Sequence, residues 1–288
     1  MSRLIESNFY EQEGRYINVA FQVLTQTIDN SGISVAGSLA GKIILSDSGN
    51  NFIKKEVFPV SRDIDILIKY KDLKNLLQLG KYHPIQKVQP TYRTSYEWYG
   101  INEVLLPFEN YKLNEEIDVF VGGICAIPAT RNTYRIEETL VYNGFSLNVP
   151  EKSFIFATYI NPLAMTIERF NRFFILAVDE FVRNGEEQLK TKIYDTTYYV
   201  ALGSERVAAK KEKLNNSDPN NNILHEEDFI EYDKKFEKVP TVIDAGLKKL
   251  VRIARYSGFQ GEDAERVGKI VRDGIREYEK ILQAVKRK

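Results

Sequence analysis

Two aspartates, Asp63 and Asp65, stand two residues apart in an otherwise apolar segment, 63–68. In a β-strand, residues two apart project from the same face, so the two carboxylates would share one small space. Each carboxylate disfavours ionisation of the other unless a positive charge lies between them. Mg²⁺ would remove this repulsion, because it takes oxygen ligands from one or two carboxylates and from phosphates.

A third aspartate, Asp118, lies in a second segment that is similarly apolar. If the strand that carries it runs beside the first, three acids would meet and could hold two ions. Ahead of both segments stand Gly37 and Ser38. Glycine permits close approach of the backbone, and the N–H groups at the start of the following helix point at an anion. These residues together predict a site for a divalent cation and a phosphate group.

The order of these segments resembles a known family. Val-Ala-Gly-Ser at 35–38, Arg-Asp-Ile-Asp-Ile-Leu at 62–67 and Ile-Asp-Val-Phe at 117–120 are similar to the three motifs of the nucleotidyltransferase superfamily related to DNA polymerase beta. The resemblance covers about residues 15–150. Within it, the Ser-Arg-Asp-Ile-Asp stretch at 61–65, followed by a helical C-terminal half, is similar to the AbiEii-type abortive-infection nucleotidyltransferases.

The resemblance implies an α+β fold, with a mixed β-sheet, flanking helices and a mostly helical C-terminal domain. It implies two Mg²⁺ ions held by Asp63, Asp65 and Asp118, and a nucleoside triphosphate such as ATP held at Gly37 and Ser38. The enzyme would transfer a nucleoside monophosphate to an acceptor hydroxyl of an RNA end, a protein or a small molecule. The three aspartates would be its catalytic residues. A toxin-like role with an antitoxin partner is compatible with the AbiEii similarity, but no residue indicates one.

Two other functions use the same residues. The fold could serve as a non-catalytic nucleotide- or RNA-binding module. A metal-dependent nuclease could use the same carboxylates, but Leu67 stands where a lysine would be expected two residues after the acidic pair. Lys42 lies one helical turn after Ser38 and could reach a triphosphate, although a solvent-exposed position is the more ordinary expectation for a lysine.

The hydrophobic pattern predicts the elements that must position these residues. The N-terminal part, 1–150, is expected to be the catalytic domain, and 151–288 a helical domain with an exposed loop at 203–238. The predicted helices are 16–28, 71–79, 154–183 with a break at 161–162, 186–200, 242–256 and 263–285. The predicted strands are 33–35 leading through a tight turn into a helix, 63–69, one or two within 91–106, 116–121 ending at 122–123, and a hairpin within 136–149 around Asn143 and Gly144.

Charge and composition limit the cellular setting. The 288 residues carry 40 basic and 40 acidic side chains, so no global field draws the protein to nucleic acid or to an anionic membrane. The single cysteine, Cys125, excludes an internal disulfide and fits a reducing compartment. No window approaches the roughly 20 apolar residues that cross a bilayer. We therefore expect a cytoplasmic protein with no membrane partner.

The C-terminal helices carry local positive charge. Basic residues recur about one turn apart, in one group at 248–255 and in a second at 269–280, with a packing stripe on the opposite face of the last helix. Such faces can bind the phosphates of an acceptor RNA, or they can simply be solvated. The second group consists of Lys269, Arg272, Arg276 and Lys280.

Overall fold

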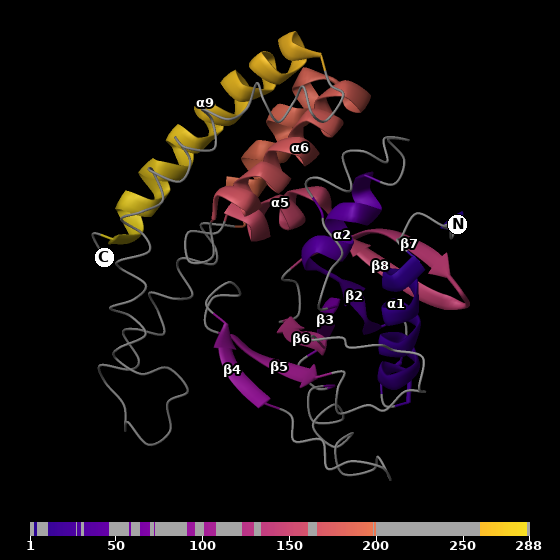
Figure 1. Cartoon of the computed structure of the whole chain (residues 1–288). Helices are drawn as coiled ribbons and strands as arrows, with labels where there is room; N and C mark the ends of the chain where they lie inside the picture. Colours follow the sequence, from indigo (N-terminus) through magenta and orange to yellow (C-terminus); the bar gives the residue numbers. More distant parts are fainter. Residues whose placement is uncertain are drawn as a thin grey trace. The chain divides into compact units, whose positions relative to one another are not determined.

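The fold is an α+β arrangement with one mixed β-sheet and several helices (Figure 1). The computed structural model describes residues 3–4, 11–26, 28–29, 32–45, 58, 64–69, 72, 91–95, 101–107, 123–129, 134–160, 166–197, 199 and 260–286. The chain divides into two compact units, with the main division between Glu151 and Lys152. The first unit holds α1 (Glu11–Leu24), α2 (Gly37–Ile44) and most of the sheet.

The sheet of the first unit is mixed because β3 pairs with neighbours of opposite direction. β3 is antiparallel to β2 and parallel to β6. Among the described residues the strands lie in the order β1-β7-β8-β2-β3-β6-β5-β4. Their bounds are β1 (Arg3–Leu4), β2 (Ser34–Val35), β3 (Ile64–Lys69), β4 (Thr91–Ser95), β5 (Ile101–Pro107), β6 (Gly123–Ala129), β7 (Ile136–Tyr142) and β8 (Phe145–Pro150).

Helix α1 buries one apolar stripe, which includes Ala20 and Leu24 of the predicted pattern. Ile17, Ala20, Phe21 and Leu24 recur at helical spacing and are fully buried. The helix begins earlier than the predicted residue 16 and ends before the predicted residue 28. After Leu24, the hydroxyl of Thr25 donates to the carbonyl of Phe21 at 2.7 Å. The backbone N–H of Thr25 donates to the same carbonyl at 2.9 Å, and that of Ile28 donates to the carbonyl of Leu24 at 2.9 Å.

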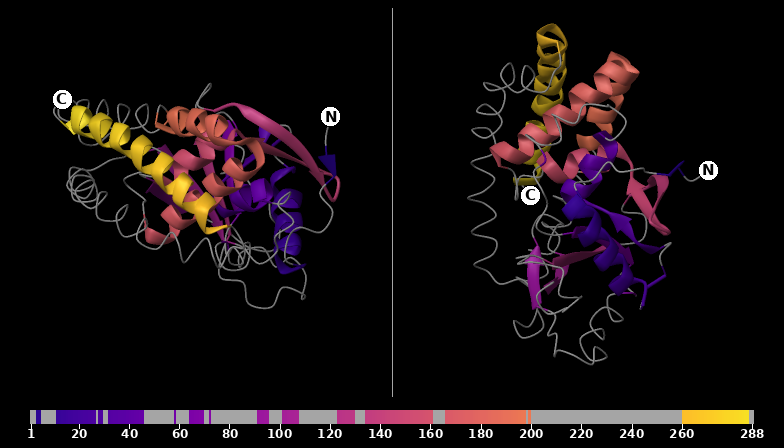
Figure 2. Two further views of the ribbon diagram at one scale, coloured as in Figure 1. Left: turned by 90° about the horizontal axis from the view of Figure 1, so that it is seen from above. Right: turned by 45° about the vertical axis from the view of Figure 1, so that its right-hand side comes forward.

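One face of the sheet packs against α1. The rings of Phe21 in α1 and Phe145 in β8 lie 5.6 Å apart. Leu147 and Val149 alternate with polar neighbours along β8 and share the face of Phe145, so they belong to the same core. Helix α2 contacts β3 and β8. Figure 2 shows these elements from two further sides. Apolar residues at alternate positions along the strands therefore form a core between the sheet and the two helices.

The hairpin β7–β8 confirms the predicted turn at Asn143 and Gly144. These residues have φ of 47° and 84°, and a two-residue hairpin of type I′ requires positive φ at both positions. Asparagine and glycine tolerate this conformation best. The side-chain amide of Asn143 also donates to Asn18 Oδ1 in α1 at 3.0 Å, which ties the hairpin to the helix.

From Lys152 onward, the described part of the second unit is mainly helical. It contains α5 (Lys152–Ile160), α6 (Ile167–Asn184), a helix at 186–197 and α9 (Gly261–Lys286). The sequence predicts helix over 154–183 with a break at 161–162, and the structure has α5 ending at Ile160 and α6 beginning at Ile167. α6 begins with Thr166, whose side chain accepts from the backbone N–H of Arg169 at 3.2 Å, and ends at Gly185 with φ of 85°.

Aromatic side chains fill the core of the helical unit. Phe156 of α5 meets Phe173 of α6 edge to face, with ring centroids 5.4 Å apart. Every residue of α5 from Ser153 to Ile160 is buried, so this helix is covered on all sides rather than along one stripe. Among the described residues, no helix has the length and apolarity that crossing a bilayer requires.

Candidate functional site

Gly37 and Asp65 meet at the start of α2. A Cβ atom added to Gly37 would lie 2.7 Å from Cγ of Asp65, and closer still to one carboxylate oxygen. The backbone N–H of Ala36 donates to the carbonyl oxygen of Asp65 at 2.9 Å. Gly37 has φ of 52°, a conformation that favours glycine. The Asp65 carboxylate therefore lies directly against the backbone of the first turn of α2.

Strand register explains this contact. Val35 of β2 pairs with Ile66 of β3, so the chain leaves β2 just beside Asp65. Ala36 remains extended, with φ of −139°, and Gly37 then turns the chain into α2 without a longer loop. The strand, tight turn and helix start that the sequence predicts at 33–40 are confirmed, as is the strand predicted at 63–69.

The other two predicted acids lie outside the described residues. Asp63 immediately precedes β3, and Asp118 precedes β6. The predicted strand 116–121 also lies outside them. Gly123, where the sequence predicts a strand to end, begins β6 instead, and Asp65 is in register with Cys125. The glycine pair at 122–123 did not mark the end of a strand, because glycine is compatible with the start of a strand as well as with its end. The convergence of the three acids stays a prediction.

Lys42 is buried, contrary to the expectation of solvent exposure. The residue is 2% exposed and lies in α2, one turn beyond Ser38. Side chains on a helix tilt toward its N-terminus, so Lys42 covers the turn that contains Ser38. Its neighbours Leu39, Ala40, Ile43 and Ile44 are buried as well. The expectation was wrong because most of this short helix is covered, which the sequence around a single lysine does not reveal.

A row of polar side chains lies on the same face of the sheet as Asp65. Leu67 shares that face with Asp65, and the register places Ser34, Asn148 and Thr139 opposite one another on successive strands. Phe145 faces α1, so Asn148, three residues later, projects from the opposite face. The sheet thus has an apolar face toward α1 and a face with polar groups that includes Asp65.

Hydrogen bonds satisfy this polar row. Asn148 donates to the carbonyl of Ile33 at 2.8 Å and accepts from the Thr139 hydroxyl at 2.8 Å. The hydroxyl of Tyr134 donates to Ser34 Oγ at 3.0 Å. Burial raises the pKa of the Tyr134 phenol, and the hydrogen bond with Ser34 opposes that effect only in part, so the hydroxyl stays protonated at neutral pH. Sequence reasoning missed this row, although the buried Asn148 in an apolar strand was a signal for it.

The donor chemistry at the corner of Gly37 and Asp65 suits a hard cation. A carboxylate oxygen is a preferred ligand of Mg²⁺, and the absence of a side chain at Gly37 lets the Asp65 carboxylate lie against the first turn of α2. Among the described residues no group of three or more histidine, cysteine, aspartate or glutamate side chains is placed to hold a metal ion. Asp63 and Asp118 are not among those residues.

The predicted basic face of the last helix is partly neutralised. Arg276 lies 3.8 Å from Asp273, and Lys280 lies 2.5 Å from Glu277, both within α9. Lys269 and Arg272 make no ion pair with another described residue. The first basic group, at 248–255, lies outside the described part of the chain. The described face is therefore a mixture of both signs, with a small positive excess.

No protein-family model matches the chain, and neither the curated proteins nor the solved structures include one with significant similarity to it. The contact between Gly37 and the Asp65 carboxylate is therefore the main evidence for the class of protein.

Proposed function

We propose that this chain is a metal-dependent nucleotidyltransferase, related in fold to the DNA polymerase beta superfamily and possessing its Gly-Ser turn and acidic strand. The observation that carries the proposal is the contact between the Asp65 carboxylate and Gly37 at the start of α2. A phosphate ligand needs backbone N–H groups that it can approach closely, and a divalent cation needs a carboxylate within reach of the same phosphate. One corner of the first unit offers both features.

The proposed site uses five residues of the sequence. Gly37 and Ser38 hold the phosphates of a nucleoside triphosphate through the first turn of α2, and Asp65, with Asp63 and Asp118, holds the metal ions. Bound Mg²⁺ would stabilise negative charge on the reacting phosphate oxygens. The buried Lys42 adds positive charge within the same helix, and a buried ammonium requires a compensating partner.

The reaction would be an in-line displacement at the α-phosphorus. The acceptor hydroxyl oxygen forms a bond to the α-phosphorus as its proton passes to Asp118, and the bond from the α-phosphorus to the bridging oxygen breaks. The electron pair of that bond leaves on pyrophosphate. The acceptor, an RNA end, a protein or a small molecule, receives the nucleoside monophosphate.

The experiment measures pyrophosphate release and nucleotide binding together. Purified protein is incubated with each α-labelled nucleoside triphosphate, Mg²⁺ and mixed acceptors, and Mg²⁺-dependent triphosphate binding is measured by calorimetry. We expect Asp65→Asn to lower turnover by more than about 100-fold, since a ligand to the metal is lost. Glu137→Gln is the matched control, because it neutralises an exposed carboxylate on β7 in the same sheet.

The outcomes separate three functions. Triphosphate binding without pyrophosphate release would indicate the non-catalytic binding module, and acceptor shortening without a triphosphate would indicate a nuclease. Asp65 could also act only as an anionic group at the N-terminus of α2. In that case Asp65→Asn would lower the thermal midpoint but leave triphosphate binding unchanged, and the proposal would be wrong.

A further inference from the structure

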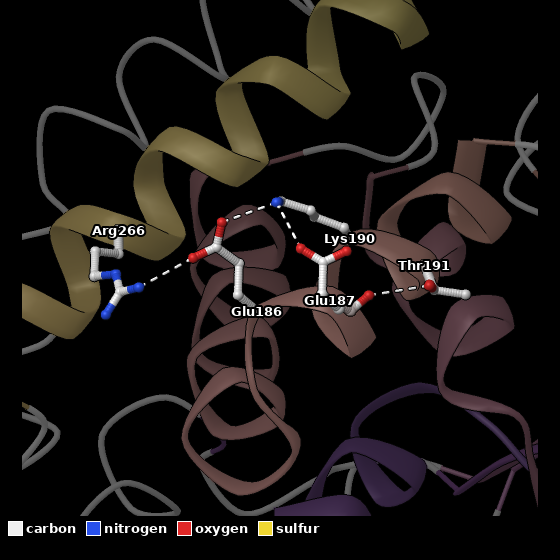
Figure 3. A network of polar contacts seen from close by, with 5 residues as sticks. All are labelled: Glu186, Glu187, Lys190, Thr191 and Arg266. Carbon is white, nitrogen blue, oxygen red and sulfur yellow. Dashed lines mark hydrogen bonds and ion pairs between the residues drawn. The ribbon is translucent and has the colours of Figure 1, made fainter.

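A cavity of about 550 Å³ lies between the helix 186–197 and α9 in the helical unit. Its size is within the range of small-ligand pockets, roughly 300–1,000 Å³. The polar network at its edge joins the two helices (Figure 3). Glu186, Lys190, Ile193 and Tyr194 of the first helix line it together with Arg266 and Lys269 of α9.

The cavity combines an apolar wall with an exposed aromatic ring. Ile193 is 7% exposed and packs where Gly274 has no side chain, which lets α9 approach closely. Tyr194, the next residue, is 76% exposed. A single exposed tyrosine needs no explanation on a surface, but here it borders a cavity with isoleucines beside it. Such a ring is a platform on which a flat, partly apolar group can stack.

Three basic and three acidic side chains line the cavity, and all but one of them make an ion pair within the described part of the chain. Glu186 accepts from Lys190 at 2.9 Å and from Arg266 at 3.1 Å. Lys190 also reaches Glu187, and the two carboxylates on α9, Asp273 and Glu277, pair with the next basic residues of that helix. Lys269 is the basic residue that makes no ion pair with another described residue.

We propose that this cavity binds one nucleotide of a single-stranded nucleic acid, with the base stacked on Tyr194 and its phosphate at Lys269. Stacking on exposed aromatic rings together with basic side chains is how proteins hold single strands without reading their sequence. A single lining cation without an ion pair among the described residues, Lys269, suits a phosphodiester, which carries one negative charge per nucleotide. It does not suit a free triphosphate, which carries several.

A single strand bound in this cavity would be the acceptor in the proposed nucleotidyl transfer, and this part of the inference rests on the proposed function. The two claims concern different residues in different units of the chain. Binding of a single strand at Tyr194 and Lys269 is measured without Mg²⁺ or a triphosphate. It can therefore fail or succeed independently of Asp65 and Gly37.

The test is fluorescence anisotropy of the full chain with a labelled hexamer of oligoadenylate, and with its deoxy counterpart to distinguish RNA from DNA. We expect Tyr194→Ala to weaken binding about tenfold, in line with the loss of one stacked base. Lys269→Ala should weaken it several-fold and lower the slope of log K against log salt by about 0.7, the value for one single-strand phosphate contact. Asp65→Asn should bind the hexamer as the wild type does.

Two matched controls keep the test specific. Val182→Ala removes another exposed apolar side chain, which lies on α6 away from the cavity, and Arg272→Ala removes an exposed cation of α9 that does not line it. Both should bind the hexamer normally, and circular dichroism should show the same helix content for all variants. If Arg272→Ala weakens binding as much as Lys269→Ala, or if Tyr194→Ala binds like the wild type, the cavity is not the site and the proposal is wrong.

Discussion

Asp65 and Glu186 are both carboxylates beside a helix, but the protein holds them in different ways. Asp65 lies on a strand between buried neighbours, against the backbone of Gly37. Glu186 lies at the surface and is held by the long side chains of Lys190 and Arg266. A carboxylate placed by strand register tolerates almost no change in its surroundings, whereas one held by flexible side chains adapts. The two sites should therefore respond very differently to single substitutions.

The largest effect is expected from Gly37→Ala. The added methyl would collide with the Asp65 carboxylate, and alanine at φ of 52° adds a strain of about 1–2 kcal/mol. We expect the free energy of unfolding, measured by urea unfolding, to fall by more than that strain. We also expect Mg²⁺-dependent triphosphate binding, measured by calorimetry, to be lost. Gly144→Ala is the control, because Gly144 also has positive φ but no atom lies within 4 Å of its added methyl. Equal losses in both variants would show that the contact with Asp65 does not constrain the corner.

A smaller effect is expected from Asn148→Ala in the polar row. The variant removes the buried bond to the Ile33 carbonyl and the partner of the partly buried Thr139 hydroxyl. Unsatisfied buried groups cost about 1–3 kcal/mol, so unfolding should become easier by about that amount. Thr191→Ala, which removes a hydroxyl bond on an exposed helix face, should change stability by less than about 0.5 kcal/mol. If the two losses are the same, the row does not stabilise the sheet.

Asp179 offers a pH-dependent test in the helical unit. Burial raises the pKa of this carboxyl, and the nearby positive charges of Arg183 and Lys152 counter it only in part, while Glu180 raises it further. Between the ordinary aspartate pKa of about 3.9 and the raised value, the folded state binds more protons than the unfolded state. Stability should therefore fall as the pH rises through that window.

Asp179→Asn should remove this fall. The measurement is the unfolding free energy as a function of pH, with Asp273→Asn, an exposed aspartate, as the control. The difference between wild type and Asp179→Asn should change with pH in the window and be constant above it. A difference that does not vary with pH would contradict the expectation.

The smallest effect is expected from Glu186→Gln. Hydrogen bonds from Lys190 and Arg266 lower the pKa of Glu186, so their stabilisation is present above the ordinary glutamate pKa and is lost as the pH falls through the lowered value. Exposed ion pairs contribute little, and salt screens them. The thermal midpoint should shift by less than about 2 °C, and less still at high salt. A shift as large as that of Asn148→Ala would remove the distinction between the two units.

Local patterns were sufficient for several elements. The alternation of apolar residues predicted β3, the asparagine and glycine pair predicted the turn of the β7–β8 hairpin, and helical periodicity predicted α9. These features depend on neighbours within a few positions, so the chain shows them directly. The bounds of α1 and the start of β6 were less accurate, because the ends of elements depend on contacts with distant residues.

The sequence by itself determined that residue 37 is a glycine able to turn a strand into a helix, that Asp65 lies in an apolar strand, and that Asn143 and Gly144 reverse the chain. Only the tertiary structure decided that Gly37 lies against Asp65, that Lys42 is buried, and that Tyr134, Ser34 and Asn148 share the face of Asp65. The reason is physical: turn and strand preferences are local properties of the backbone, whereas register between strands is set by pairing across many residues.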